Sequence, residues 1–471
     1  MTRSDIQSYI HAESTQQMIR KDLAEIIAIP SVSVDGTAPH IFGDATAKAL
    51  DTILAIGERY GFVCENHDYY CGSIVLPGEN PEDEIGAIAH VDVVPAVEGW
   101  TYPRYELTID EEKGIYVGRG VHDDKGPAIM ILTAMRFFQE HNIRLPFSIR
   151  LILGCDEERG MDDLPHYLET RKAPRFSFSP DSEFPVCIGE KGIAQLLFDL
   201  GVADGGLVSI RGGIVTNSVA DHAEAAFLPE KYPALIALKL PEGISLSANS
   251  NGEPVLTALG KSAHAAMPKN SINAILKLAQ FILDSNLLDD DSNSKKALTF
   301  LTAALADNYG TGLGMAVADE ITGNLTCICG LAKTVDGHLQ FDCNIRYPSS
   351  FDFADLFANA QAITEKAGFG VTLTSDSKGY VFEPDRAEIR ALTAAVSEVL
   401  GKESKPYTMG GGTYARAFPN TVAFGAALSS VSDILGEGRG EAHDRDEAVR
   451  ISDFNTAIEI FIRAFANLAG L

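Results

Sequence analysis

Histidine and acidic residues that could bind metal follow short apolar runs at several places in the chain. The run at residues 85–89 leads into His90 and Asp92, and residues two apart on an extended chain face the same way. The side chains of His90 and Asp92 are therefore expected to project together. The other candidates follow two further apolar runs or lie in a glycine-bounded turn: Asp123, Asp124, Glu157, Glu158 and Asp181.

Together, these residue types suit metal-assisted hydrolysis. Taken singly, each has an ordinary interpretation, such as a hydrogen-bonded histidine after a strand or a solvated pair of glutamates in a turn. Several carboxylates at one place would repel one another, and burying unpaired charges is costly. A divalent cation removes that conflict, and mixed histidine and carboxylate ligands suit zinc or manganese better than magnesium.

The same segments contain a candidate base. One member of the pair Glu157-Glu158 could bind metal while its neighbour takes a proton from water held by the metal. Asp92 could hydrogen-bond His90 and fix its tautomer. His443, in the polar segment at residues 440–447, is the weakest candidate by itself. Residue types and spacing thus indicate a two-metal hydrolase.

The elements that must position these residues alternate between helix and strand in the first part of the chain. Apolar runs at residues 85–89, 148–153 and 176–179 predict central strands of an α/β sheet. Active sites of open α/β sheets gather at the carboxyl ends of such strands. Helical spacing predicts helices at residues 15–28, 44–60 (with Asp44 as the N-cap) and 126–141.

The pattern changes at about residue 189. Amphipathic helices and alternating strands occupy the middle of the chain, at residues 271–284, 294–306, 353–367 (helices) and 339–346 (strand). We predict an α/β fold in which a catalytic domain, with a mixed central sheet flanked by helices, is interrupted by an inserted α+β domain. The predicted bounds are residues 1–188 and 383–471 for the catalytic domain and 189–382 for the insert.

Composition argues against several other classes of protein. The 471 residues carry a net charge of −27, which repels phosphate backbones and argues against a nucleic-acid partner. No apolar run is long enough for a membrane span, and residues 1–20 lack the apolar core of a signal peptide. Seven scattered cysteines without a CxxC pair predict buried, reduced thiols, which fits a cytoplasmic protein.

Longer motifs around these residues resemble a known family. The chain resembles the aminoacylase/carboxypeptidase superfamily of co-catalytic zinc exopeptidases at residues 90–95, 118–126 and 156–158. Within it, the chain is most similar to the peptidase V group of carnosinase-like bacterial dipeptidases, through residues 212–217, 260–264 and 410–416. The resemblance covers nearly the whole chain. It implies a zinc-exopeptidase-type catalytic domain and an inserted lid domain.

The resemblance also implies a set of metal ligands. His90 and Asp181 would bind one ion, Glu158 and His443 would bind the other, and Asp123 would bridge the two. The expected cofactors are two divalent ions, Zn²⁺ first and Mn²⁺ as the alternative. The expected substrates are dipeptides, hydrolysed by a water that the two metals share.

The remaining roles implied by the resemblance concern proton transfer and substrate binding. Glu157 would be the general base and then the acid toward the leaving amine, and Asp92 would orient His90. His264 of the lid would stabilise the oxyanion, and Arg346 would bind the substrate's terminal carboxylate. The substrate pocket would be completed by Asn217, Gly411, Gly412 and Thr413.

Two departures from the family pattern and two alternative functions remain. Arg159 replaces a small hydroxyl residue and His122 replaces a smaller residue, so metal choice or substrate preference could differ. The insert is longer than usual, and relatives with long lids duplicate the lid fold within one chain, which implies two lid subdomains and a monomer. The alternatives are a deacylase of N-acyl amino acids and an inactive relative that binds metal or peptide.

Overall fold

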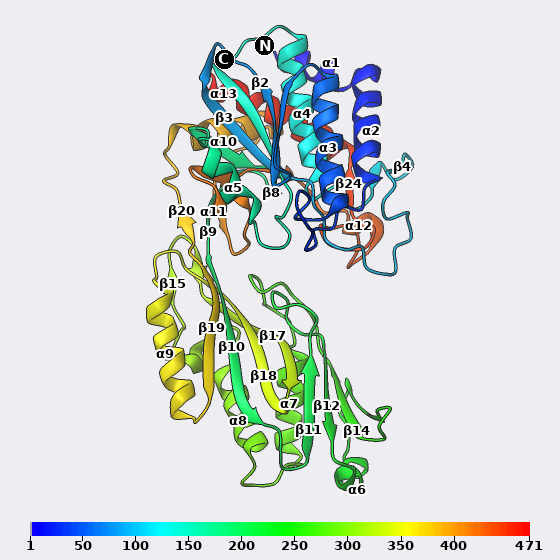
Figure 1. Cartoon of the computed structure of the whole chain (residues 1–471), viewed down its shortest axis with the longest axis vertical. Helices are drawn as coiled ribbons and strands as arrows, with labels where there is room; N and C mark the ends of the chain where they lie inside the picture. The colour runs from blue at the N-terminus through cyan, green and yellow to red at the C-terminus, as the bar shows by residue number, and fades with distance from the viewer. Residues whose placement is uncertain (1) are drawn as a thin grey trace. The chain divides into compact units, whose positions relative to one another are not determined.

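The computed structural model describes residues 2–471, which form two compact units (Figure 1). The first unit contains the residues up to Ile188 together with Phe382–Tyr407 and Thr413–Leu471. The second contains Gly189–Val381 and Thr408–Gly412. Each unit is built around a hydrophobic core of its own.

The first unit is built on a mixed sheet whose central strands are parallel. In spatial order the strands are β1 (Val63–His67), β2 (Cys71–Leu76), β6 (Phe147–Gly154), β3 (Asn80–His90), β7 (Phe176–Ser179), β22 (Thr421–Ala423) and β9 (Cys187–Glu190). β3 pairs in parallel with β6 and β7, and β7 with β22. The register sets His90 opposite Gly154, so β3 and β6 end at the same edge of the sheet.

Helices pack against this sheet, most of them around one large apolar core and the others around smaller apolar clusters. They are α1 (Arg3–Ile10), α2 (Glu13–Ile27), α3 (Asp44–Arg59), α4 (Lys125–Glu140), α5 (Asp163–Thr170), α10 (Ala387–Leu400), α11 (Tyr414–Ala417), α12 (Ser432–Leu435) and α13 (Ile451–Leu468). α4 is apolar on nearly all sides, and such a helix is stable only when it is buried on all sides. Phe178 of β7 stacks on Phe461 of α13, with ring centroids 5.8 Å apart.

Short strands complete the first unit. β24 (Ala448–Arg450) pairs with β5 (Ile115–Val117), which pairs with β4 (Thr108–Asp110). β8 (Ser182–Glu183) pairs with β23 (Ala426–Ala427), and β21 (Tyr407–Met409) pairs with β9. The ladder between β24 and β5 matters for the site because it brings the segment after His443 beside the turn that contains Asp123.

The predicted α/β fold is confirmed, but one predicted helix cap was wrong. α3 begins at Asp44 and its N-cap residue is Gly43. Gly43 has a φ of +94°, and a Cβ there would lie 2.7 Å from Val34 Cγ2, so a side chain would not fit. Asp44 Oδ1 instead lies 2.7 Å from His40 Nδ1. The carboxylate of Asp44 therefore favours the helix start through its position in the first turn.

The second unit has an antiparallel sheet with helices packed against it. In spatial order the strands are β13 (Ile244–Ala248), β14 (Pro254–Leu259), β12 (His222–Phe227), β11 (Leu207–Gly212), β17 (Thr326–Val335), β18 (His338–Tyr347), β10 (Gly192–Val202) and β19 (Gly370–Ser377). The other elements are α6 (Tyr232–Ile236), α7 (Ala274–Asp284), α8 (Asn293–Ala304), α9 (Phe353–Lys366), the 3-10 turns η1 (Pro229–Lys231) and η2 (Thr311–Leu313), β15 (Ala318–Asp319), β16 (Gly323–Asn324) and β20 (Tyr380–Val381). Alternate residues of β10 are buried, as the strand period requires.

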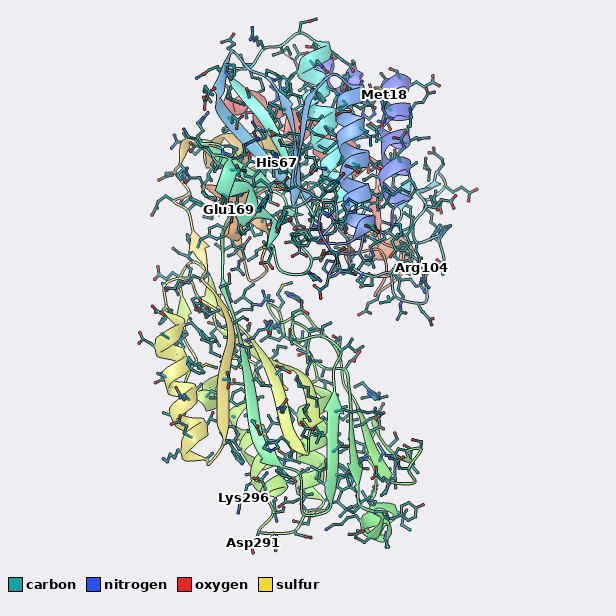
Figure 2. The ribbon with its side chains drawn as sticks, viewed as in Figure 1. Met18, His67, Arg104, Glu169, Asp291 and Lys296 are labelled. Atoms are coloured by element: carbon teal, nitrogen blue, oxygen red, sulfur yellow. The ribbon has the colours of Figure 1, made fainter. Side chains whose placement is uncertain are left out.

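Many acidic side chains lie on the surface of the two units. Glu169 at the end of α5 and Asp291 before α8 are exposed examples (Figure 2). Among residues 2–471, no helix combines the length and the apolar character that crossing a membrane requires.

Candidate metal centre

The first unit delivers the predicted metal ligands to one place through the ends of its parallel strands. His90 is the last residue of β3, Glu157 and Glu158 follow β6, and Asp181 follows β7. Asp123 lies in the turn before α4. The parallel register brings the carboxyl ends of these strands to one edge of the sheet, where side chains from different strands converge.

Asp123 lies between two imidazoles. Its Oδ1 is 2.9 Å from His90 Nε2, and its Oδ2 is 2.9 Å from His443 Nε2. Each oxygen of one carboxylate therefore faces a different histidine. This is the arrangement expected of a bridging ligand.

The remaining carboxylates extend this cluster on both sides of Asp123. His443 Nε2 lies 3.1 Å from Glu158 Oε2, and His90 Nε2 lies 4.0 Å from Asp181 Oδ2. Within each of two groups, the donor atoms lie within 4.8 Å of one another. One group is His90, Asp123 and Glu158, and the other is His90, Glu157 and Asp181, so His90 belongs to both. The cluster could hold metal ions.

The electrostatics of the cluster fit divalent cations. Burial raises the pKa of Asp181 and of Glu157 well above the ordinary values, and the nearby carboxylate of Asp123 adds to both rises. Burial opposes ionisation of Asp123 too, but hydrogen bonds from His443 and His90 hold the pKa of Asp123 well below its ordinary value. Burial also lowers the basicity of His443, yet hydrogen bonds to Asp123 and Glu158 raise its pKa to about 11.

One buried oxygen of the cluster also lacks a partner. Among the described residues, Glu158 Oε1 accepts no hydrogen bond although it is buried. An unpaired buried carboxylate oxygen is costly, and coordination to a cation would remove that cost. The crowded acids, the two imidazoles and this oxygen therefore fit a divalent cation.

Asp92 contacts both sides of the cluster. Its Oδ1 lies 3.3 Å from His90 Nδ1, and the backbone oxygen of Asp92 lies 3.0 Å from the same nitrogen. Its carboxylate also accepts the backbone N–H of Glu157 at 3.3 Å and that of Glu158 at 3.1 Å. Asp92 thus holds the His90 ring and the start of the acidic turn together, a wider contact than the sequence suggested.

Asp163 is a site-supporting residue that the sequence analysis missed. Its Oδ2 accepts the backbone N–H of Cys155 at 2.6 Å and of Asp156 at 3.0 Å, and it also accepts the hydroxyl of Tyr414. These bonds hold the segment that leads from β6 into Glu157. No local pattern marks this role, because Tyr414 is distant in the sequence.

The two unusual residues near the site have defined contacts. Arg159 points to other acids: its Nη1 is 2.8 Å from Asp35 Oδ1 and its Nε is 3.2 Å from Asp156 Oδ1. His122 lines a hollow of about 280 Å³ beside Asp123 and Asp181. His122 is therefore placed where it can influence what binds beside the cluster.

The predicted substrate-binding residues lie mostly in the second unit. There, the backbone N–H of Ala265 donates to the carbonyl of Asn217 at 2.9 Å, which ties the loops that carry Asn217 and His264. Arg346 Nε donates to Asn344 Oδ1 at 2.8 Å and its Nη1 donates to the carbonyl of Gly410 at 2.9 Å. Gly411 and Gly412 belong to this unit as well.

Thr413 belongs to the first unit, where its side chain caps a short helix. It is the N-cap residue of α11, and its Oγ1 accepts the N–H of Ala415 at 3.1 Å.

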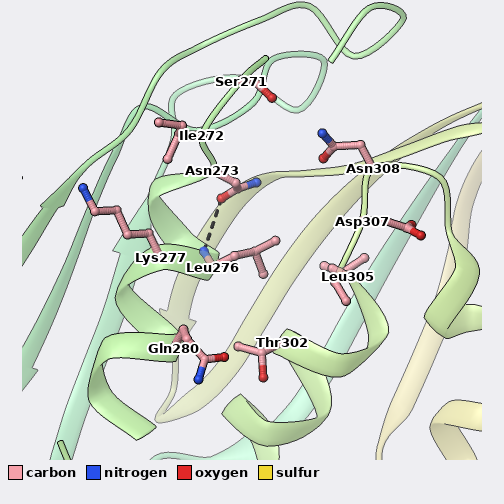
Figure 3. A pocket seen from close by; sticks show the side chains of 11 residues that line it. Ser271, Ile272, Asn273, Leu276, Lys277, Gln280, Thr302, Leu305, Asp307 and Asn308 are labelled. Atoms are coloured by element: carbon pink, nitrogen blue, oxygen red, sulfur yellow. Dashed lines mark hydrogen bonds between the residues drawn. The ribbon is translucent and has the colours of Figure 1, made fainter. Parts of the chain in front are cut away.

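The second unit contains a larger hollow that lacks a cluster of metal-donor side chains. It measures about 450 Å³ and lies between α7 and the end of α8 (Figure 3). Asn273 caps α7 at its rim, where Asn273 Oδ1 accepts the N–H groups of Ile275 and Leu276. Its ionisable lining residues are Lys277 and Asp307. This lining contains no cluster of metal donors, so we place the candidate site in the first unit.

The fold and the site define the class of the protein. A cluster of imidazole and carboxylate donors at the carboxyl edge of a parallel α/β sheet is the arrangement of an α/β metallohydrolase. More narrowly, the chain belongs to Peptidase family M20/M25/M40, whose sequence model matches residues 86–467.

Individual relatives agree with this membership. "Putative dipeptidase YtjP" of Bacillus subtilis strain 168 is 31% identical over 463 residues, covering 95% of this chain and 96% of that protein. "Putative dipeptidase SAR1836" of Staphylococcus aureus strain MRSA252 is 31% identical over 489 residues, covering 99% of each. The structure of human carnosine dipeptidase 1 is 16% identical, with a TM-score of 0.60 and 100% of both chains covered. The dipeptidase Dug1p of Saccharomyces cerevisiae is 15% identical, with a TM-score of 0.59 and coverage of 100% of this chain and 99% of that one. At this identity the structures show a shared fold.

Proposed function

We propose that this protein is a two-metal dipeptidase whose active centre is the cluster around Asp123. The observation that carries the proposal is the position of Asp123, with one carboxylate oxygen 2.9 Å from His90 and the other 2.9 Å from His443. Dipeptides are the proposed substrates because full-length relatives at 31% identity carry a dipeptidase designation.

The chain offers two sets of ligands around the shared carboxylate. His90 and Asp181 would hold one ion, and His443 and Glu158 would hold the other, consistent with the contacts between these pairs. When bound, two divalent ions polarise the scissile carbonyl and acidify the attacking water. Zn²⁺ is the first choice and Mn²⁺ the second, because of the mixed nitrogen and oxygen donors.

Glu157 is the proposed general base. Its neighbour Glu158 is paired with His443, which leaves Glu157 as the member of the acidic pair assigned to proton transfer. Burial raises the pKa of Glu157, a direction that suits a group which first accepts a proton from water and then donates it to the leaving amine. The two N–H bonds that Asp92 accepts would keep the Glu157 backbone in place.

The second unit would supply groups that recognise the terminal carboxylate and the reacting carbonyl of the substrate. Arg346 would bind the terminal carboxylate of a dipeptide, since a guanidinium matches a carboxylate in shape and charge. Its contacts with Asn344 and the Gly410 carbonyl would fix the plane of the guanidinium. His264 would stabilise the oxyanion, with Asn217, Gly411, Gly412 and Thr413 completing the pocket. Binding of the free C-terminus by Arg346 would set an upper limit on substrate length.

The test is hydrolysis of dipeptides by protein stripped of metal and then reloaded with Zn²⁺ or Mn²⁺. Activity should return with metal, and Glu157→Gln should lower kcat by about 10²–10⁴-fold. Glu169→Gln is the matched control, because Glu169 is an exposed glutamate on α5, and it should keep wild-type activity. N-acetyl amino acids run in parallel would reveal a deacylase. Metal uptake without turnover of any dipeptide would overturn the proposal.

A further inference from the structure

A buried ion pair joins the two loops that carry Asp123 and His443. Arg119 Nη1 donates to Glu447 Oε2, and both side chains are 0% exposed. Removing two charges from water is expensive unless further hydrogen bonds satisfy them. The other contacts of Arg119 and Glu447 therefore indicate what the pair does.

Glu447 organises the turn that presents Asp123. Its Oε1 accepts three backbone N–H groups of this turn: from Gly120 at 2.9 Å, from His122 at 2.9 Å and from Asp123 at 3.2 Å. Three donors on one carboxylate oxygen hold these peptide groups of the turn in one orientation. The position of the Asp123 backbone, and so of its carboxylate, depends on Glu447.

Arg119 organises the loop that presents His443. Its Nη2 donates to the carbonyl of His443 at 3.2 Å and to that of Asp444 at 3.2 Å. The centre of the guanidinium lies 5.3 Å from the ring centroid of Trp100, which packs against it. The forked guanidinium serves the carboxylate through one nitrogen and the two carbonyls through the other, a geometry that the compact ammonium of a lysine would match poorly.

The backbone explains how residues so far apart in the sequence meet. β24 pairs with β5 so that Ala448 lies opposite Val117. The ladder continues for one more bond, in which the N–H of Gly118 donates to the carbonyl of Glu447 at 2.9 Å. Glu447 is thereby placed against the turn that begins at Gly118.

We propose that Glu447 and Arg119 are positioning residues that set the distance between the bridging carboxylate of Asp123 and the imidazole of His443. The inference rests on the proposed metal centre and adds two residues that touch neither metal nor substrate. Because Asp123 is shared, disturbing Glu447 should weaken the binding of both ions. Because Arg119 holds the His443 loop, disturbing Arg119 should weaken mainly the ion bound by His443 and Glu158.

The experiment measures Zn²⁺ affinity by competition with a chromophoric chelator, using the metal-stripped full-length protein. Glu447→Asp keeps the charge but shortens the side chain, and Arg119→Lys keeps the charge but removes the fork. Removing a hydrogen-bond partner of a metal ligand typically costs about 10–100-fold in affinity. We expect a loss of that size at both sites for Glu447→Asp and at one site for Arg119→Lys. Saturating Zn²⁺ should restore the kcat of Arg119→Lys for a dipeptide.

Glu84→Gln provides the matched control. Glu84 pairs with Arg150 in the same unit, with contacts of 2.9 Å and 2.6 Å, and it lies in the first half of β3, away from His90. This variant should bind both ions with wild-type affinity. Circular dichroism of each metal-free variant checks that it is folded, and Arg119→Lys remains a test if Glu447→Asp does not fold.

The outcomes separate this inference from the proposed function. Wild-type affinity at both sites in folded Glu447→Asp and Arg119→Lys would overturn the positioning role while leaving the metal centre intact. Failure of the wild-type protein to bind two ions would overturn the proposed metal centre, and the positioning role with it.

Discussion

The carboxyl group of Asp163 should make the stability of the metal-free first unit depend on pH. Burial is the main cause that raises the pKa of Asp163 from 3.8 to about 6, in spite of the hydrogen bond from Tyr414. In the unfolded chain the carboxyl has its ordinary pKa, so the folded state binds more protons between these two values. Over the whole titration, a rise of this size changes the free energy of unfolding by about 3 kcal/mol, because each unit of pKa shift corresponds to about 1.4 kcal/mol.

The sign of the effect follows from which state holds the proton. The stabilising contribution of protonated Asp163 is fully present below the unfolded pKa of 3.8, and it is lost as the pH rises through about 6. Asp163→Asn cannot ionise, although its amide oxygen can still accept the N–H groups of Cys155 and Asp156. Relative to this variant, the wild-type protein should therefore lose about 2 kcal/mol of unfolding free energy between pH 4.5 and pH 7.5.

The assay is urea unfolding of both proteins in chelator, from pH 4.5 to pH 7.5, followed by tryptophan fluorescence. The chain contains one tryptophan, Trp100, which lies in the first unit, so the signal reports on the unit that contains Asp163. Other groups titrate in the same range, but they are common to both proteins, and the difference between the two curves isolates Asp163. A difference that does not change with pH would refute the reasoning.

Three further predictions concern the core, a helix cap and the state of assembly. Phe178→Ala should lower the unfolding free energy by about 3–5 kcal/mol, because the ring is 0% exposed and packs on Phe461; a much smaller loss in urea unfolding would contradict this packing. Thr413→Ala should lower the unfolding free energy by about 1 kcal/mol through loss of the cap of α11, and Thr413→Ser should restore it. An unchanged unfolding midpoint in Thr413→Ala would remove the capping role. Light scattering should give the mass of one chain, 50.6 kDa, and a stable mass of twice that value would remove the monomer prediction.

Local patterns in the sequence were sufficient for several strands and for the candidate metal-binding residues beside them. The apolar runs before His90 and Glu157 predicted β3 and β6, because a buried strand needs apolar side chains on both faces. His90 and Asp92 are two residues apart, so their shared direction followed from the geometry of an extended chain. The cap of α3 was mispredicted because Asp44 contacts His40 and the preceding Gly43 is in a conformation that only the tertiary packing reveals.

The sequence alone therefore determined which residues could bind metal, and the tertiary structure decided how they are held. His443 lies in a polar segment that looks like an ordinary loop, and only folding brings its imidazole to 2.9 Å from Asp123. No local signal pairs Glu447 with Arg119, since they are 328 positions apart and meet through the pairing of β24 with β5. The physical reason is that periodicity reports which face of one element is buried. A contact between distant segments depends on strand register and loop closure, which no short pattern encodes.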